Sequence, residues 1–153
     1  MYINISNSKS ILEFSTNEGT KTLAEIMGTS EGFDNPKNVE LIEYLLGLLN
    51  KKNALVLDSF AGSGTTAHAV LRLNQRDDGN RRFILCEMMD YAETITAERV
   101  RRAMNGYGEG KSKTEGLGGS FEYFELGEPL FLENELLNES VGIERIRQYV
   151  SYS

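Results

Sequence analysis

A tight turn rich in glycine, placed between a short apolar segment and a helical one, constrains the fold more than any other feature of this sequence. A strand is predicted over residues 54–58, the turn runs through Phe60-Ala61-Gly62-Ser63-Gly64, and a helix is predicted from Thr65 to Asn74. Glycine is needed where a ligand approaches the backbone closely, because a side chain would block it. The free amide groups of the turn and the dipole of the following helix favour an electron-rich ligand group at this point.

A second strand and a second helix follow the first pair. The strand is predicted over 82–87 and ends in Glu87, and the helix is predicted from Tyr91 to Met104. This order is typical of an α/β fold with a doubly wound, mostly parallel sheet. In such folds an acid at the end of the second strand accepts hydrogen bonds from ribose hydroxyls, which predicts a nucleoside-bearing ligand. Strand 54–58 is apolar up to its final Asp58, so we expect it to be covered on both faces.

Three classes of ligand compete for the glycine turn. A triphosphate loop needs a lysine after its last glycine, and none follows Gly64, which excludes that class. A dinucleotide site needs Gly-x-Gly-x-x-[Gly/Ala], and Gly62, Gly64 and Ala67 satisfy this pattern formally. Asp58 would repel a pyrophosphate and suits a cationic ligand, such as the ammonium and sulfonium of S-adenosylmethionine. A nicotinamide-dependent oxidoreductase domain therefore remains the alternative to a site for S-adenosylmethionine.

The flanking segments are less informative. Residues 1–32 are a polar lead-in, with a turn expected over 16–20 and a short helix over 23–27. Asn35 is the predicted N-cap of the next helix and Pro36 its first residue. The apolar face of that helix consists of Val39, Ile42, Leu45, Leu46 and Leu49.

Beyond the second predicted helix the sequence predicts three further segments. Residues 105–119 are rich in glycine and predict a surface loop. Residues 120–126 alternate apolar and polar side chains, as a strand does, and Tyr123 and Phe124 are expected in the core. Residues 127–153 are mixed, with a helix predicted over 141–150.

Several motifs in one order resemble the adenine-specific DNA methyltransferases that serve as modification subunits of type III restriction–modification systems. The glycine motif from Asp58 to Val70 and the run from Asp78 to Ile84 carry most of the resemblance. The segments at 16–20, 33–37 and 121–131 resemble that family's lead-in, its motif X and its later region. The resemblance covers about residues 15–150. It implies a Rossmann-like methyltransferase fold with S-adenosylmethionine as cofactor, bound by residues 33–126, and residues 127–153 as a C-terminal extension.

The resemblance also implies a set of cofactor-binding residues. Glu87 would hold the ribose, and motif X would close over the methionine end. Ser59 and Asn38 depart from the family pattern, which bears on affinity more than on identity. The implied cofactor-binding residues are Phe33, Pro36, Lys37, Asp58, Phe60, Ala61, Gly62, Ser63, Gly64, Thr65, Thr66 and Glu87.

The catalytic motif of this family is absent from the sequence. Amino-methyltransferases of this kind use Asp-Pro-Pro-Tyr to orient the amine and stack the flipped base, and the two prolines here, Pro36 and Pro129, are not adjacent. No catalytic residue is therefore assigned. In the family's circular order the catalytic motif and the target-recognition region precede motif X, which implies a C-terminal piece that lacks this half. DNA would be contacted only within the full-length enzyme, and a restriction subunit and further copies of the chain are other candidate partners.

Charge and cysteine content set further limits. The formal net charge is −7, so the chain alone is expected to bind nucleic acid poorly. The single cysteine excludes a disulfide within the chain and a cysteine-based zinc site, and no metal site is predicted. The sequence has no signal peptide and no membrane span, which favours a cytoplasmic protein. An assembly surface without catalytic activity is a second alternative, because apolar area would be exposed where the missing half belongs.

Some reactive side chains have simple structural interpretations. His68, the sole histidine, is expected to have a packing or surface role, and Cys86 is expected as a small apolar residue within a strand. The acids Asp77 and Asp78 are interpreted as solvated loop residues. A solvated helix face is expected from the basic residues Arg99, Arg101 and Arg102.

Overall fold

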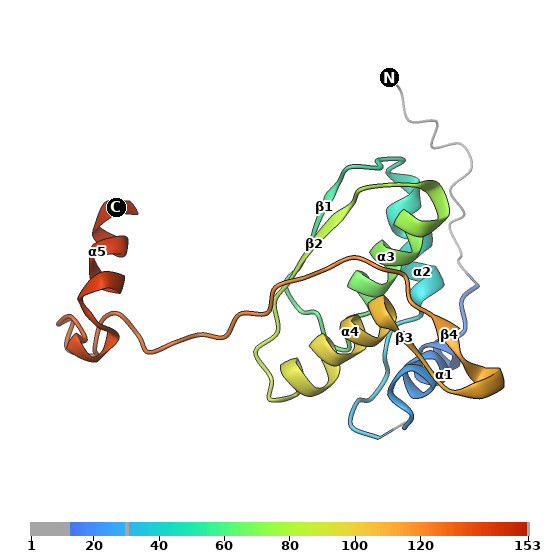
Figure 1. Ribbon diagram of the computed structural model, residues 1–153, viewed down its shortest axis with the longest axis horizontal. Coiled ribbons are helices and arrows are strands. Elements are labelled where there is room, and N and C mark those ends of the chain that lie inside the picture. Colours follow the sequence, from blue (N-terminus) through green and yellow to red (C-terminus); the bar gives the residue numbers. More distant parts are fainter. Residues whose placement is uncertain (1–12, 30, 153) are drawn as a thin grey trace. The chain divides into compact units, whose positions relative to one another are not determined.

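The computed structural model describes residues 13–29 and 31–152, and the chain divides into two units (Figure 1). The first unit ends at Ser120 and contains the predicted glycine turn, whereas the second begins at Phe121. Most of the predicted polar lead-in, residues 1–12, lies outside the described residues. None of the described helices is long and apolar enough to cross a membrane.

Two parallel strands form the sheet that carries the glycine turn. Strand β1 (Leu55–Asp58) pairs with β2 (Arg82–Leu85), with Leu55 opposite Arg82 and Asp58 opposite Leu85. Helix α3 (Thr65–Asp77) connects them, which confirms the predicted order of strand, turn, helix and strand. The carboxyl ends of both strands lie at one edge of the sheet, where ligands bind in folds of this class. The described chain therefore has a mixed α/β fold with a small parallel sheet.

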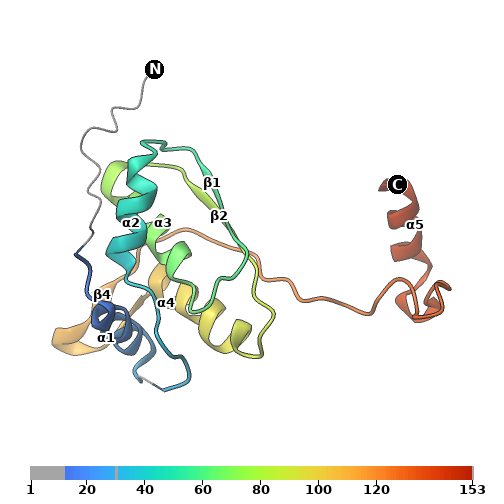
Figure 2. The same ribbon diagram turned by 180° about the vertical axis from the view of Figure 1, so that it is seen from behind.

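The two faces of this sheet differ in exposure. Side chains alternate between half-buried and exposed along both strands, and Leu57 is 65% exposed and Ile84 48% exposed. Figures 1 and 2 show the helices of the first unit gathered to one side of β1 and β2. The expectation that strand 54–58 is covered on both faces is wrong for the described residues. Its apolar residues point to both faces, but helices of the first unit pack on one face only.

Helix α3 forms the centre of the hydrophobic core. Ala67, Ala69 and Val70 are fully buried. Helix α3 packs against α2 (Val39–Leu48), α4 (Glu98–Asn105) and β2, and α4 also packs against α1 (Thr16–Met27). The core therefore consists mainly of helix–helix contacts.

Two helix starts differ from the predictions. The N-cap of α2 is Asn38 rather than Asn35, and its side-chain oxygen accepts hydrogen bonds from the amides of Glu40 (2.7 Å) and Leu41 (3.4 Å). Asn35 has a left-handed backbone with φ 54° and lies before the helix together with Pro36. The turn expected over 16–20 is instead the first part of α1. A β-carbon at position 19 would collide with the carbonyl oxygen of Pro36, so Gly19 lets that backbone approach the helix.

The helix predicted over 91–104 begins with an unusual turn. Residues Ala92–Ala97 form the π-helix η2, and α4 continues to Asn105. The glycine-rich segment that follows contains a small antiparallel pair, β3 (Gly106–Tyr107) and β4 (Thr114–Glu115), with the 3₁₀ turn η3 (Gly110–Ser112) between them.

The strand predicted over 120–126 is wrong. These residues pair with no strand in the described chain, and Phe124 is 79% exposed. Tyr123 is 38% exposed, so the expectation that it and Phe124 belong to the core is also wrong. The alternating pattern satisfies one condition for a strand, but a strand also needs a neighbour to pair with.

The second unit contains one longer helix. The 3₁₀ turn η4 (Glu139–Val141) leads into α5 (Ile143–Tyr152), which confirms the helix predicted over 141–150. Asn138 caps η4 by accepting from the amide of Ser140 at 3.1 Å, and it donates to the carbonyl of Pro129 at 2.9 Å.

Candidate functional site

The glycine turn is a fixed backbone structure between the ends of the two strands. The amide of Ala61 donates to the carbonyl of Cys86 at 3.0 Å, and the amide of Gly64 donates to the carbonyl of Ala61 at 2.9 Å. Gly62 and Gly64 have φ values of 53° and 75°, a conformation that favours glycine. The turn leaves Phe60 86% exposed at its tip. The sequence prediction of a tight glycine turn after β1 is confirmed.

Asp58 ties the end of β1 to the start of α3. One carboxylate oxygen accepts from the amide of Phe60 at 3.2 Å, and the other accepts from the hydroxyl of Thr66 at 2.5 Å. A carboxylate has about four acceptor positions, so each oxygen keeps one for a further donor. Asp58 therefore shapes the turn and also places a negative charge beside it.

Glu87 joins the glycine turn to the segment after β2. Its Oε2 accepts from the amide of Gly62 at 2.8 Å, and its Oε1 accepts from the amides of Met88 and Met89 at 2.9 and 3.0 Å. These bonds use three of about four acceptor positions. Burial, the charge of Glu87 and a hydrogen bond to Glu87 together raise the pKa of Tyr91.

Part of the segment 33–37 lies against the turn. The tip of the Phe33 ring lies 3.1 Å from where a β-carbon on Gly62 would be, and Phe33 stacks edge-on against Tyr91 with ring centroids 5.1 Å apart. The hydroxyl of Thr65 donates to the carbonyl of Lys37 at 3.4 Å. Pro36 instead lies beside α1 at Gly19.

Arg99 lies behind the turn and is fully buried. Its Nη1 donates to the hydroxyls of Ser63 and Thr65, both at 2.8 Å, and to the carbonyl of Ser63 at 3.2 Å. The expected solvated face of α4 is therefore wrong at Arg99. Arg102 also differs, because it donates to the carbonyls of Ile26 and Met27 and pairs with Glu98.

The sequence hides the role of Arg99 because a run of charged residues suggests a solvated surface. Its burial follows from helical spacing, since Thr96, Val100 and Ala103 are buried on the same side of the helix. Arg101, by contrast, is part-exposed and pairs with Glu93 at 2.7 Å.

The prediction for His68 is confirmed, whereas the prediction for Cys86 is wrong. His68 is 4% exposed on α3, which confirms its expected packing role. Burial lowers its pKa to about 3, with further contributions from the charges of Arg99 and Arg72. The expectation for Cys86 is wrong in two respects, because this residue is exposed and follows the last residue of β2.

The connection between α3 and β2 is held by a buried arginine. Arg81 is 6% exposed and binds both carboxylate oxygens of Asp77, at 2.9 and 2.7 Å. The side-chain amide of Asn74 donates to the carbonyl of Arg81 and accepts from its amide. The hydrogen bonds from Arg81 lower the pKa of Asp77, which is the last residue of α3, so the interpretation of this residue as a solvated loop acid is wrong. The run from Asp78 to Ile84 thus contains the arginine of this structural cluster.

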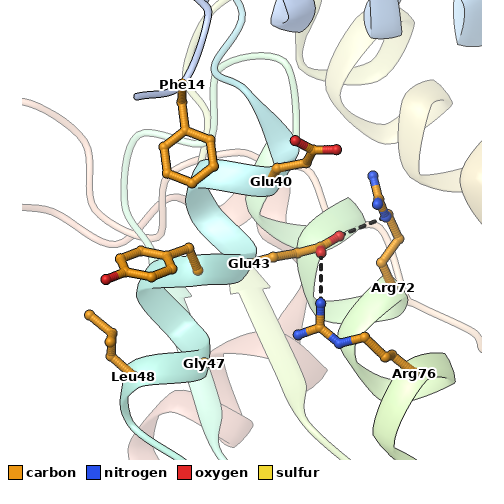
Figure 3. A pocket seen from close by; sticks show the side chains of 8 residues that line it. Phe14, Glu40, Glu43, Gly47, Leu48, Arg72 and Arg76 are labelled. Atoms are coloured by element: carbon orange, nitrogen blue, oxygen red, sulfur yellow. Dashed lines mark hydrogen bonds and ion pairs between the residues drawn. The ribbon is translucent and has the colours of Figure 1, made fainter. Parts of the chain in front are cut away.

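A separate pocket of about 520 Å³ lies at the surface formed by α2 and α3 (Figure 3). Glu43 is buried there and pairs with Arg72 at 2.6 Å and with Arg76 at 3.3 Å. Burial raises the pKa of Glu43, although both arginines oppose this shift. Sequence reasoning missed this cluster, whose signal was the acid Glu43 in the middle of an otherwise mostly apolar helix. None of the predicted site residues lines this pocket.

Comparison with known proteins adds a separate line of support. A family model described as DNA methylase matches residues 4–99. The Mod subunit of the type III restriction-modification enzyme StyLTI from Salmonella typhimurium is 49% identical over 72 residues, or 47% of this chain and 11% of that protein. The EcoPI Mod subunit of Escherichia phage P1 is 43% identical over 98 residues, or 64% of this chain and 14% of that protein.

A relative from another class of system also matches. The type II methyltransferase M.KpnI of Klebsiella pneumoniae is 46% identical over 74 residues, or 48% of this chain and 18% of that protein. The chain thus spans less than a fifth of the length of each of these relatives. The matches confirm the resemblance to type III modification subunits that the sequence motifs carry.

Proposed function

Because the chain belongs to the DNA methylase family, we propose that its glycine turn binds S-adenosylmethionine as the cofactor site of an adenine-specific DNA methyltransferase of a type III restriction–modification system. The observation that carries the proposal is the pair of acids around the turn. Asp58 lies at the end of β1, and Glu87, just beyond β2, is bonded to the amide of Gly62.

The chemistry of this donor set fits a cationic nucleoside better than a dinucleotide. Two carboxylates beside one turn repel a pyrophosphate and attract an ammonium or sulfonium. Asp58 keeps one unused acceptor position on each carboxylate oxygen, which it would offer to the ammonium group. Glu87 would accept a ribose hydroxyl in place of its hydrogen bond with Tyr91. Phe33 would provide an apolar wall beside Gly62. When bound, the cofactor supplies a methyl group on a positively charged sulfur.

We further propose that this chain alone binds the cofactor without transferring its methyl group. The sequence has no Asp-Pro-Pro-Tyr motif to hold a target amine. In the complete enzyme the amine of a flipped adenine would attack the sulfonium methyl, and the protein would contribute mainly by positioning. DNA and a restriction subunit would be partners of that complete enzyme.

Calorimetry of the purified chain tests the cofactor directly. Titration with S-adenosylhomocysteine should give saturable binding, whereas titration with NAD should give none. Binding of NAD alone would contradict the proposal and favour a nicotinamide-dependent oxidoreductase. A second titration into an Asp58→Asn variant should show weaker binding of S-adenosylhomocysteine, because the charge beside the turn is lost.

One observation favours a second candidate function. The sheet face that carries Leu57 and Ile84 is exposed, and Met88 beyond β2 is 89% exposed. Exposed apolar area of this kind is typical of an interaction surface. Under this alternative the chain would associate with increasing concentration, and S-adenosylhomocysteine would not change that association. Sedimentation velocity with and without the ligand separates the two functions.

A further inference from the structure

The carboxylate of Glu87 has its full hydrogen-bonding capacity in use within the protein. Its Oε1 accepts from the amides of Met88 and Met89, and its Oε2 accepts from the amide of Gly62. A carboxylate has about four acceptor positions, two on each oxygen, so these bonds leave one position on Oε2. The hydroxyl of Tyr91 forms a further hydrogen bond with the same carboxylate. This bond takes the remaining position.

Tyr91 is the donor in this hydrogen bond. A carboxylate only accepts, and a phenol keeps its proton up to about pH 10. Burial, the negative charge of Glu87 and the hydrogen bond itself raise the pKa of Tyr91 above its ordinary value, so the hydroxyl is a donor at neutral pH. A ribose hydroxyl would donate to Glu87 in the same way. The two donors therefore compete for one acceptor position.

Phe33 holds the ring of Tyr91 beside Glu87. The two rings pack edge-on, with an interplanar angle of 88° and centroids 5.1 Å apart. The tip of the Phe33 ring lies 3.1 Å from where a β-carbon on Gly62 would be, and the amide of Gly62 is bonded to Glu87. The four residues thus form a closed set of contacts beside the glycine turn.

Tyr91 can leave Glu87 without a change in the fold. It is half-buried and lies just before η2, after the exposed residues Met88, Met89 and Asp90. Rotation of its side chain toward solvent breaks one hydrogen bond and one ring contact. The three amide bonds to Glu87, which fix the turn, do not involve Tyr91 and stay in place.

We propose that the hydroxyl of Tyr91 occupies the ribose position on Glu87 and must be displaced when a nucleoside binds, so that Tyr91 weakens the affinity of the site for ligands with ribose hydroxyls. This inference rests on the proposed function and concerns the sugar of the same ligand. The hydrogen bond gained from the sugar is offset by the one lost from Tyr91. The ribose hydroxyls therefore add little to the affinity while Tyr91 is present.

The test compares two ligands that differ only in the ribose hydroxyls. Calorimetry gives the affinities of S-adenosylhomocysteine and of its dideoxy analogue, which lacks both hydroxyls, for the wild type and for Tyr91→Phe. In the wild type the two affinities should lie within about threefold of each other. Tyr91→Phe keeps the ring on Phe33 and removes the competing hydroxyl, so S-adenosylhomocysteine should bind about three- to tenfold more tightly. The affinity for the dideoxy analogue should change by less than about twofold.

A matched variant separates this role from a general effect of losing a hydroxyl. Tyr44→Phe removes the same atom from a tyrosine that contacts Phe14 in the pocket of α2 and α3, and it should alter neither affinity. A selective gain in Tyr91→Phe is a result that a purely structural role of Tyr91 does not produce.

Three results would overturn the inference and leave the proposed function intact. They are weaker or unchanged binding of S-adenosylhomocysteine in Tyr91→Phe, an equal gain for both ligands, and a wild type that already prefers S-adenosylhomocysteine by more than about tenfold. The last result is measured without any variant. Failure of the wild type and Tyr91→Phe alike to bind S-adenosylhomocysteine would instead overturn the proposed function, and this inference with it.

Discussion

The carboxylate of Glu87 accepts a hydrogen bond from the backbone amide of Gly62 at 2.8 Å. This bond joins the segment after β2 to the turn after β1. The other oxygen of Glu87 holds the amides of Met88 and Met89. The acid expected to contact a ribose is therefore also the residue that fixes the shape of the turn.

Replacing Glu87 by glutamine should destabilise the turn. The amide of glutamine has one oxygen and one NH₂ group, so either Gly62 or the pair Met88 and Met89 would face a donor instead of an acceptor. We expect the free energy of unfolding to fall by about 1–3 kcal/mol, measured by urea denaturation. Glu109→Gln, at an exposed acid, is the control and should change it by less than about 0.5 kcal/mol. Equal effects of the two substitutions would contradict the role assigned to Glu87.

Alanine substitutions at Gly64, Gly62 and Gly47 should change the free energy of unfolding by different amounts. At Gly64 the new β-carbon would lie 2.9 Å from the backbone oxygen of Thr96, which cannot move easily, and φ is 75°. We expect a loss of about 2–4 kcal/mol there. At Gly62 the neighbour is the Phe33 ring, which can shift, and we expect a loss of about 1–2 kcal/mol.

Gly47 is the matched control for these substitutions. It lies within α2, has no atom within 4 Å of the added β-carbon, and has no positive φ. Gly47→Ala should therefore raise stability by about 0.5–1 kcal/mol. Thermal unfolding of the three variants tests the order, and a Gly64→Ala variant as stable as Gly47→Ala would refute the packing described at Thr96.

The stability of the chain should depend on pH through His68. Its folded pKa of about 3 lies below its ordinary value of 6.5, so the unfolded state binds more protons between these values. Stability should therefore fall as the pH is lowered from 6.5 toward 3. When the pH is lowered from 6.5 to 5, the free energy of unfolding of a His68→Leu variant should fall by about 1–2 kcal/mol less than that of the wild type. His68 is the sole histidine, so identical pH profiles would contradict its burial as a neutral group.

Two leucines should respond very differently to the same truncation. Leu73 on α3 is 1% exposed, whereas Leu57 on β1 is 65% exposed. We expect Leu73→Ala to cost about 2–5 kcal/mol and Leu57→Ala less than about 1 kcal/mol. Leu57→Ala should also reduce any concentration-dependent association of the chain. A large loss of stability in Leu57→Ala would mean that another segment covers this face of the sheet.

Local pattern was sufficient for the elements around the turn. The apolar run before Asp58, the glycines and the helical spacing after Thr65 predicted β1, the turn and α3, all of which are present. The structure also brings Phe33, Lys37 and Glu87 to the turn, as the motifs indicated. Their roles toward a cofactor stay predictions.

The sequence predictions were wrong where contacts between distant parts of the chain determine the structure. Asn35 and Asn38 are equally good caps by residue type, but Asn35 adopts a left-handed backbone, and Asn38 makes the capping bonds. The alternation over 120–126 indicated a strand, but in the described chain these residues form none, because strand pairing is not determined by alternation alone. Arg99 lies in a run of charged residues, which is typical of a solvated helix face. Its burial depends on its angular position around the helix relative to the neighbouring apolar residues.

The π-helix η2 makes a deletion in this segment differ from a deletion in a regular helix. A π turn contains one residue more than an α turn. Removing one residue from Ala92–Ala97 would let this turn close as an ordinary α turn, whereas the same deletion in a regular α-helix turns everything after it by about 100°, because each α-helical residue advances by that angle. Val100 would then stay in the core, and Arg99 would stay beside the hydroxyls to which it donates. The start of this helix can therefore lose one residue without separating α4 from the turn that it supports.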